Sequence, residues 1–207
     1  MTKTEIIRRV KILMEELTPF DDGLIVLNSD VKPIESYIDN SLQPSCDEML
    51  KQCPLHLTTP KTLVTNGKLT ARLDNNKNIG TLTLPSDFIR LHTFKMRGWE
   101  RPIQRLISVE NPDYIKQLNP FTRGGNSKPV MVRKSGIVEI YTYDASDRVE
   151  TALYVARIDM QEQYIEMSEE LYNALCHLIA ANVYAVFGNK QSEYMQTKYQ
   201  TLLMNSL

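Results

Sequence analysis

This chain of 207 residues lacks an excess of charge of either sign, because 24 Lys and Arg residues stand against 25 Asp and Glu residues, a formal net charge of -1. A protein that binds DNA through many phosphate contacts normally carries a basic excess. The composition therefore counts against a strongly basic nucleic-acid-binding protein, although local patches of charge are not excluded. With 42% apolar residues, the chain is long enough to bury one sizeable core or two small ones.

Cysteine is scarce, and the chain carries three of them at irregular spacing. An odd, irregular set argues against a secreted disulfide scaffold and indicates a reducing compartment. The first residues lead directly into a charged amphipathic pattern, so we expect no signal peptide. A long uncharged run at residues 171–189 is interrupted by Asn173, His177 and Asn182 and is short for a bilayer core of ~30 Å, so we expect no membrane span.

Helical periodicity marks the N-terminal part of the chain. Thr2 and Glu5 have the spacing of a capping box, and Pro19 is placed to end the helix. The apolar stripe of this predicted helix consists of Ile6, Val10, Leu13, Met14 and Leu17.

Two shorter helices are expected in the next segment. The first begins near Asp30, has Pro33 in its first turn and ends before Pro44, because a proline rarely continues a helix. The second is capped by Ser45 and ends near Cys53. We therefore expect Pro44 to separate two helices.

In the middle of the chain the apolar period changes to two, which is typical of strands. Asn66 and Gly67 lie between two apolar runs and predict a hairpin, because both residues tolerate positive φ. Further on, residues 130–132, 137–143 and 149–158 are separated by turn residues. These three runs predict an antiparallel meander.

The segment at residues 84–91 reads Leu-Pro-Ser-Asp-Phe-Ile-Arg-Leu and is the most informative stretch of the chain. Pro85 cannot donate to a sheet and is expected to end one strand, and the next two residues favour a turn. The chain is then expected to re-enter the sheet at once. A second turn at Gly98 carries the only tryptophan, Trp99.

A short helix is predicted at residues 112–118, followed by a loop at residues 119–128. The end of this loop, from Arg123 to Lys128, is basic and contains glycine, which suits a phosphate or an acidic partner. It lacks the order of glycines, lysine and serine of a P-loop. A flexible surface loop is the favoured interpretation.

The C-terminal part predicts one long helix, capped by Ser168 and ended by Gly188 in a left-handed conformation. Because this helix is apolar on two faces, it has to be sandwiched, either inside its own bundle or between neighbouring subunits. One stripe consists of Tyr172, Leu175, Cys176, Ile179, Val183 and Val186. The other consists of Leu171, Ala174, Leu178, Ala181 and Ala185.

These patterns predict an α+β fold. Residues 1–58 and 165–207 are expected to form a helical bundle from both chain ends, with an antiparallel β-rich module inserted at residues 59–164. We see no internal repeat in the sequence.

Candidate metal ligands are few. Cys46, Cys53 and His56 could bind zinc with Cys176 or His177 completing a tetrahedron, but their spacing matches no compact zinc module. Packing of the cysteines inside helices is the favoured interpretation. We predict no metal ion and no cofactor.

Candidate catalytic groups have simpler interpretations. Asp144 and Asp147 are turn formers, Glu169 and Glu170 begin a helix, and no nucleophile can be placed beside His177. We therefore predict no catalytic residues and a protein that is not an enzyme. A small hydrolase and a small nucleic-acid-binding protein stay open as alternatives; the latter would need a recognition helix with outward polar side chains.

Five residues are predicted to contact other chains: Trp99, Arg101, Phe121, Arg123 and Lys128. Phe121 combines with Arg123 and Lys128 to give an aromatic anchor beside charge that an acidic partner could match. Trp99 is either the cap of a small β core or an exposed anchor, and the sequence leaves both alternatives open.

The order of these features resembles the head-to-tail adaptor proteins of bacteriophages, most closely those of crAss-like phages and more distantly the tail tubular proteins of short-tailed phages. The resemblance covers most of the chain. It is carried by the helices at both ends, the segment at 84–91, Gly98-Trp99, Lys128-Pro129-Val130 before the meander, and the uncharged helix that ends in Val186-Phe187-Gly188.

The resemblance implies a structural virion protein without catalytic residues, which forms a homo-oligomeric ring, commonly a dodecamer, at the head-tail junction. Such a ring binds the portal protein and other tail or ring proteins, and it surrounds the channel through which the DNA passes. Contact with the genomic DNA is expected to be transient and non-specific, and no membrane is involved. The expected location is the virion, and the host cytoplasm during assembly.

Overall fold

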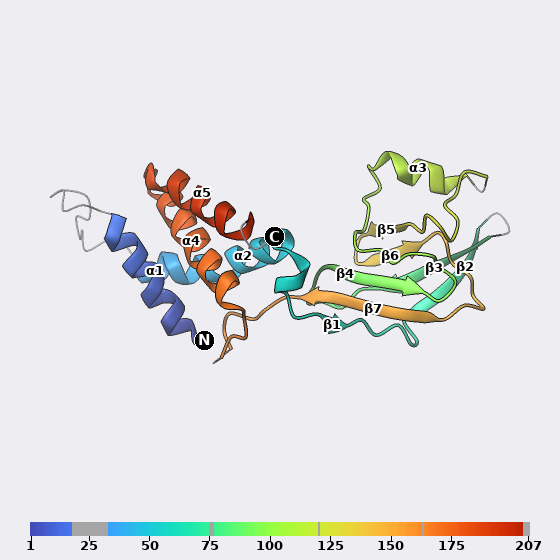
Figure 1. The fold of residues 1–207 in the computed structure, drawn as a ribbon, viewed down its shortest axis with the longest axis horizontal. Coiled ribbons are helices and arrows are strands. Elements are labelled where there is room, and N and C mark those ends of the chain that lie inside the picture. The colour runs from blue at the N-terminus through green and yellow to red at the C-terminus, as the bar shows by residue number, and fades with distance from the viewer. Residues whose placement is uncertain (18–32, 75–76, 120, 163, 205–207) are drawn as a thin grey trace. The chain divides into compact units, whose positions relative to one another are not determined.

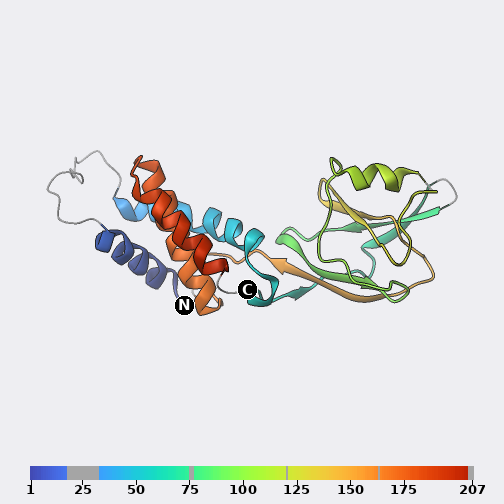
Figure 2. The ribbon, with the colours of Figure 1, turned by 45° about the horizontal axis from the view of Figure 1, so that its top comes forward.

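The fold is drawn in Figures 1 and 2 from a computed structural model. The structure describes residues 1–17, 33–74, 77–119, 121–162 and 164–204. Contacts between residues divide the chain into a helical unit, Met1–Thr58 with Arg157–Leu207, and a β unit, Thr59–Ala156. The predicted α+β class, with helices from both chain ends and an inserted antiparallel β module, is confirmed.

The second boundary between the units follows Ala156, eight residues before the predicted boundary at 164/165. The residues in between join the helical unit because Gln43 ties them to it. The Gln43 side chain donates to the Ile158 carbonyl at 2.9 Å and accepts from the Met160 N–H at 3.0 Å. The side chains of Met160 and Ile165 are buried, and both residues belong to the helical unit.

The helical unit contains α1 (Lys3–Leu17), α2 (Ile34–Gln52), the short 3-10 helix η1 (Leu55–Leu57), α4 (Glu169–Val186) and α5 (Gln191–Met204). Helix α4 is central and packs on α1, α2 and α5 (Figure 1). The Tyr184 hydroxyl donates to the Met14 carbonyl of α1 at 2.8 Å, and Asn182 Nδ2 donates to Ser45 Oγ of α2 at 2.9 Å. These bonds connect α4 with both N-terminal helices.

Both ends of α4 carry the predicted signals. Ser168 Oγ accepts a hydrogen bond from the Leu171 N–H at 3.3 Å, and Gly188 has a φ of +62°. Between Leu171 and Tyr184 both predicted apolar stripes are buried within the helical unit. The alternative in which α4 is sandwiched inside its own bundle therefore holds for this part of the helix.

Pro44 does not separate two helices, so this prediction is wrong. Helix α2 runs through it without interruption from Ile34 to Gln52. Ser45 is not a cap; it is fully buried and accepts the hydrogen bond from Asn182. The buried stripe of α2 continues on both sides of the proline, and its burial offsets the lost backbone hydrogen bond. The predicted positions at Pro19 and Asp30 lie outside the described residues.

The β unit contains two antiparallel sheets. In the first sheet the strand order is β1 (Lys61–Thr62), β7 (Val149–Ala156), β4 (Phe88–Met96). In the second it is β2 (Leu69–Asp74), β3 (Lys77–Thr83), β6 (Ile137–Ile140), β5 (Met131–Lys134). The main core of the unit draws buried side chains from both sheets, such as Phe94 from β4 and Leu82 from β3.

The second sheet also has an apolar outer face. Because side chains alternate along a strand, Ile79 and Val132 lie on this face, with Tyr141 just beyond the end of β6. Helix α3 (Pro112–Leu118) packs beside them through Tyr114, whose ring centroid lies 6.1 Å from that of Tyr141. The short helix predicted at residues 112–118 is confirmed.

The predicted hairpin at Asn66 and Gly67 is wrong, although the turn is present. The Leu69 N–H donates to the Thr65 carbonyl at 2.9 Å, and Gly67 has a φ of +70°. The strands on its two sides belong to different sheets, because β1 pairs with β7 and β2 pairs with β3. The turn therefore carries the chain from one sheet to the other.

Two further pairings differ from the prediction in the same way. The turn after Pro85 is present, with the Phe88 N–H donating to the Pro85 carbonyl at 3.1 Å. It does not return to the same sheet, since β3 and β4 lie in different sheets. The predicted meander is correct only for β5 and β6, because β7 pairs with β4 and β1.

Candidate docking surface

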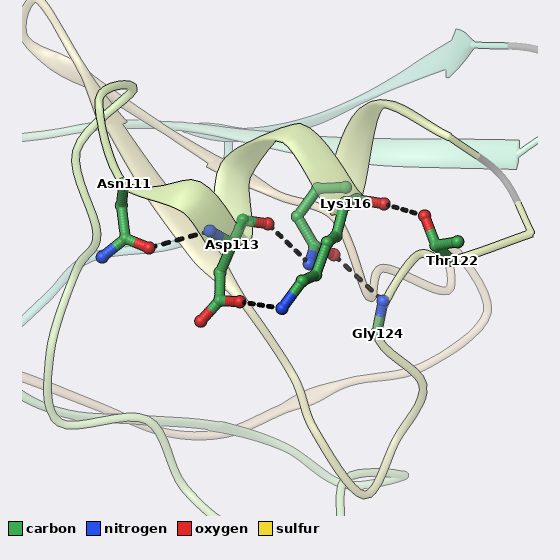
Figure 3. Close-up of polar contacts among 6 residues, drawn as sticks. Asn111, Asp113, Lys116, Thr122 and Gly124 are labelled. Atoms are coloured by element: carbon green, nitrogen blue, oxygen red, sulfur yellow. Dashed lines mark hydrogen bonds and ion pairs between the residues drawn. The ribbon is translucent and has the colours of Figure 1, made fainter.

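Helix α3 and the loop after it are held together by several hydrogen bonds within the β unit. Asn111 Oδ1 accepts a hydrogen bond from the Asp113 N–H at 2.9 Å, and Pro112 occupies the first turn. One turn later, Lys116 Nζ lies 2.7 Å from Asp113 Oδ1. These contacts, drawn in Figure 3, order both ends of a helix of only seven residues.

Gln117 joins the helix to the loop. Its buried side chain donates to the Asp113 carbonyl at 3.1 Å and accepts from the Gly124 N–H at 3.0 Å (Figure 3). Thr122 Oγ1 donates to the Lys116 carbonyl at 2.7 Å. Carbonyl groups at the end of α3 thus find donors in the loop, as the last carbonyls of a helix require.

Gly124 is needed because the backbone passes close to itself. A β-carbon at this position would lie 2.3 Å from the Lys128 carbonyl oxygen, a distance at which the backbone would have to move. The Lys128 N–H also donates to the Gly125 carbonyl at 2.9 Å, which closes a tight turn. The loop therefore has a defined path rather than an open one.

Helix α3 and its loop expose three apolar side chains, which we call the α3 surface. The exposed fraction is 69% for Ile115, 48% for Leu118 and 97% for Phe121. The backbone at Phe121 is nevertheless held, because its N–H donates to Asn119 Oδ1 at 2.9 Å. Exposed apolar groups on a fixed backbone are typical of sites that bind another chain.

The structure brings most of the predicted interface residues to this region. Phe121, Lys128 and Arg101 are exposed. The turn before Arg101 lies against the loop, since the Glu100 N–H donates to the Asn126 carbonyl at 3.1 Å.

Arg123 is half-buried, and its side chain belongs partly to the fold. Its Nε donates to the Gln117 carbonyl at 2.8 Å, and its guanidinium lies 5.2 Å from the centre of the Tyr141 ring. Such a stacked position holds the side chain against the sheet. Arg123 is therefore less available to a partner than its sequence position indicated.

The structure corrects the assignment of Trp99 to an interface. Its side chain is only 4% exposed, and its Nε1 donates to the Thr142 carbonyl at 2.8 Å. The ring packs against Phe94 with centroids 5.7 Å apart. Of the two alternatives, the cap of a small β core is the correct one, because a Gly98 turn folds the indole inward over the sheets.

Ile115 and Leu118 were not among the predicted interface residues. They lie three positions apart, on a face of α3 that adjoins the face carrying Tyr114 and Gln117. The sequence carried this periodicity, but it did not tell which of the two faces packs on the sheet. Glutamine on the buried face made the assignment harder, since Gln is mostly found on surfaces.

A cavity of about 650 Å³ opens next to the loop, lined by residues that include Trp99, Arg123, Asp144 and Asp147. None of the three histidines lines it. The one serine in its lining, Ser146, donates to Asp144 Oδ1 at 2.7 Å as part of a turn. The lining thus pairs its serine with a turn aspartate and contains no histidine that could act as a base.

The outer face of the second sheet holds a polar cluster around Glu139, whose side chain is buried. Its oxygens lie 2.6 Å from Lys134 Nζ, 2.8 Å from the Tyr141 hydroxyl and 3.2 Å from Arg72 Nη2. Burial by itself would raise the pKa of Glu139, but the hydrogen bonds from Lys134 and Tyr141 and the neighbouring positive charges hold this pKa below its ordinary value. The carboxylate is therefore charged at neutral pH and fully paired.

Replacing Glu139 with glutamine is expected to lower the free energy of unfolding by about 1–2 kcal/mol at neutral pH, because the charged hydrogen bonds to Lys134 and Arg72 are lost. A group with a lowered folded pKa stabilises above its unfolded pKa and loses this effect as the pH falls. Urea unfolding from pH 7 to pH 3 should thus show a shallower acid decline for Glu139→Gln below the ordinary pKa of 4.5.

The matched control for this experiment is Glu150→Gln, which breaks the exposed pair with Lys95. It should change stability by no more than about 0.5 kcal/mol. An acid decline equally steep in Glu139→Gln and in the wild type would show that Glu139 does not carry the effect.

The two units carry opposite net charges. The helical unit has 9 Lys and Arg against 16 Asp and Glu, a net charge of -7. The β unit has 15 Lys and Arg against 9 Asp and Glu, a net charge of +6. The near-neutral balance of the whole chain therefore conceals a strong asymmetry, which the composition alone did not reveal.

The three cysteines are buried and form no disulfide among the residues that the structure describes. Burial raises the pKa of Cys46 and of Cys176 to about 12, so these thiols stay protonated and are poor nucleophiles and poor metal ligands. Within the described ranges, no group of three or more His, Cys, Asp or Glu side chains is placed to hold a metal ion. Burial supports the interpretation of these cysteines as packing residues.

The chain matches no family model and no curated protein. Among the helices that the structure describes, none is both long enough and apolar enough to cross a membrane. The function therefore has to be inferred from the arrangement of the residues themselves.

Proposed function

We propose that this chain is a structural connector protein of a tailed phage, one subunit of a homo-oligomeric ring that joins the portal to the tail around the DNA channel. The observation that carries the proposal is the order of elements along the chain, in which helices at both chain ends precede and follow an inserted β unit that contains the turn at residues 84–91. This arrangement has the order of elements that the resemblance to crAss-like phage adaptors implies.

The site supports the same proposal. A building block needs surfaces that bind other chains, and the α3 surface offers exposed apolar side chains on a backbone held by hydrogen bonds. DNA that passes through such a ring would contact its wall only transiently. A wall with charges of both signs suits this, since deep basic pockets would hold the phosphates and slow the passage.

The proposal is tested on purified particles of the phage that encodes the chain. Mass spectrometry of gradient-purified particles should find the protein in an amount comparable with that of the portal protein. A reconstruction of the head-tail junction should place the chain in a ring next to the portal. Absence of the protein from the particles would overturn the proposal.

Replacing Phe121 with aspartate is expected to leave folding intact and to impair assembly. The side chain is almost fully exposed, so the free energy of unfolding should change by no more than about 0.5 kcal/mol. If Phe121 is a central anchor, the yield of tailed particles in a complementation assay should fall at least about tenfold. Arg123 is left unchanged in this variant because it packs on Tyr141.

The matched control is Val64→Asp, which changes an exposed apolar residue outside the α3 surface. This variant should assemble normally. A wild-type yield of tailed particles with Phe121→Asp would remove the α3 surface from the assembly.

A further inference from the structure

We infer that the α3 surface of the β unit binds the helical unit of a second copy of this chain, so that copies associate head to tail. The inference deepens the proposed function and rests on it, since a head-to-tail contact uses two different surfaces of each subunit. Contacts of this kind close into a ring when the rotation between subunits permits it.

Charge selects this partner. Two copies that paired through the same surface would bring two β units of net charge +6 together, or two helical units of net charge -7. Like charges on facing surfaces disfavour such pairs, whereas a β unit facing a helical unit is attracted to it. Each copy thus has one unit of positive and one of negative net charge, so unlike units of two copies attract. The same asymmetry disfavours closed two-fold dimers.

Three exposed basic side chains of the β unit are available to such a partner. Arg101, Arg105 and Lys128 are exposed and form no ion pair with any residue that the structure describes. Lys128 closes the turn of the loop itself, and Arg101 follows the turn that binds Asn126. Positive charge therefore lies on the loop that carries Phe121, at Lys128, and beside it at Arg101, which follows the exposed Glu100. Charged groups next to exposed apolar side chains suit the rim of an interface.

The helical unit offers a matching segment between residues 159 and 170. Its Tyr164 side chain is largely exposed. Five exposed acidic residues share the segment and form no ion pair within the described part of the chain: Asp159, Glu162, Glu166, Glu169 and Glu170. An exposed aromatic group among carboxylates is the counterpart of the α3 surface in both polarity and charge.

A second copy fits the α3 surface better than nucleic acid does. Phosphates would use the basic groups but would leave Ile115, Leu118 and Phe121 in water. A protein partner covers the apolar and the basic groups together. The surface is therefore assigned to a protein, and DNA becomes one of the outcomes that the experiment separates.

The experiment uses two charge-reversed forms of the full chain. The first carries Arg101→Glu, Arg105→Glu and Lys128→Glu, and the second carries Glu162→Lys, Glu166→Lys and Glu170→Lys. All six side chains are exposed, so both forms should fold, which circular dichroism checks. Association is measured by sedimentation velocity at low salt for the wild type, for each form alone and for an equal mixture.

The wild type should associate, and more weakly as salt is added. Each reversed form alone should stay monomeric, because it carries charge of one sign on both surfaces. The mixture should associate at least tenfold more tightly than either form alone, since every contact in it joins opposite charges again. The matched control is Lys68→Glu with Lys61→Glu, which changes exposed basic residues away from the α3 surface and should leave association unchanged.

Two outcomes would overturn the inference. One is a mixture that stays monomeric while the wild type associates. The other is a wild type that stays monomeric at about 1 mM, where even a millimolar contact would be half occupied.

A short DNA duplex is titrated in parallel. Loss of duplex binding in the first reversed form, without any association of the wild type, would assign the basic groups to nucleic acid and would also overturn the inference. The proposed function is read separately from purified particles. If the protein is present in particles but the mixture of the two reversed forms does not associate, the connector role stands and only this docking arrangement is rejected.

Discussion

Replacing Trp99 with alanine is expected to lower the free energy of unfolding of the β unit by about 3–5 kcal/mol. The indole is almost fully buried, packs against Phe94 and donates to the Thr142 carbonyl. Its removal leaves a cavity between the sheets and a carbonyl without its donor. Urea unfolding followed by circular dichroism measures the loss, and the fluorescence of the single tryptophan reports on the β unit in the wild type.

Two companion variants separate burial from docking. Trp99→Phe keeps a ring against Phe94 and loses the hydrogen bond to Thr142, so its loss should be smaller, about 1–2 kcal/mol. Arg101→Ala changes an exposed residue two positions further along and should alter stability by no more than about 0.5 kcal/mol. If Trp99→Ala were as stable as Arg101→Ala, the indole would not be part of the core.

Local signals in the sequence predicted local structure well. The cap at Ser168 and the left-handed Gly188 each depend on residues close to a helix end, and both are present. The short helix predicted at residues 112–118 is present as well. The apolar periodicity also separated helices from strands, since a period of 3.6 residues and a period of 2 residues differ clearly over several residues. The class and the order of elements follow from such signals alone.

Strand partners could not be predicted in this way. The turns at Asn66-Gly67 and after Pro85 are both present, yet each joins strands of different sheets. A turn fixes how the chain reverses, but the sheet that the next strand joins depends on which distant strand it pairs with. The pairing of β4 with β7 links residues far apart in sequence, and no short motif encodes it.

The helix through Pro44 was missed for a different reason. Proline is a strong local signal for a helix end, and tertiary packing overrode it. The buried residues Ile38, Leu42, Cys46 and Met49 keep helical spacing across the proline, and this continuity was visible in the sequence. A stripe that continues past a proline thus indicates one helix more strongly than the proline indicates two.

Exposure, which an interface residue requires, is found for three of the five residues predicted to contact other chains. Phe121, Lys128 and Arg101 were identified from residue type and loop position, and they are exposed. Tryptophan is common both in interface anchors and in cores, so the residue type of Trp99 did not separate the two alternatives. Its burial depends on how the turn at Gly98 folds over the sheets. The opposite charges of the two units required the unit boundaries, which become clear only once the long-range contacts are known.

Replacing Ala181 with leucine is expected to destabilise the helical unit by about 2–3 kcal/mol, because Ala181 is buried and a larger side chain there would overpack the core. Ala181 is buried, and its carbonyl accepts a hydrogen bond from Ser192 Oγ of α5 at 2.9 Å. The control is Ala185→Leu, one helical turn further along the same stripe, where the side chain is exposed and the change should be no more than about 0.5 kcal/mol.

Thermal and urea unfolding of the monomer measure both alanine variants. The stripe of small residues on α4 suits either close packing inside the bundle or a contact between subunits, and the two alternatives give opposite results. In a bundle, Ala181→Leu destabilises the isolated chain whether or not it assembles. In a subunit contact, it would leave the monomer as stable as the wild type and change only its association, an outcome that would reverse the assignment of α4 to the core of its own unit.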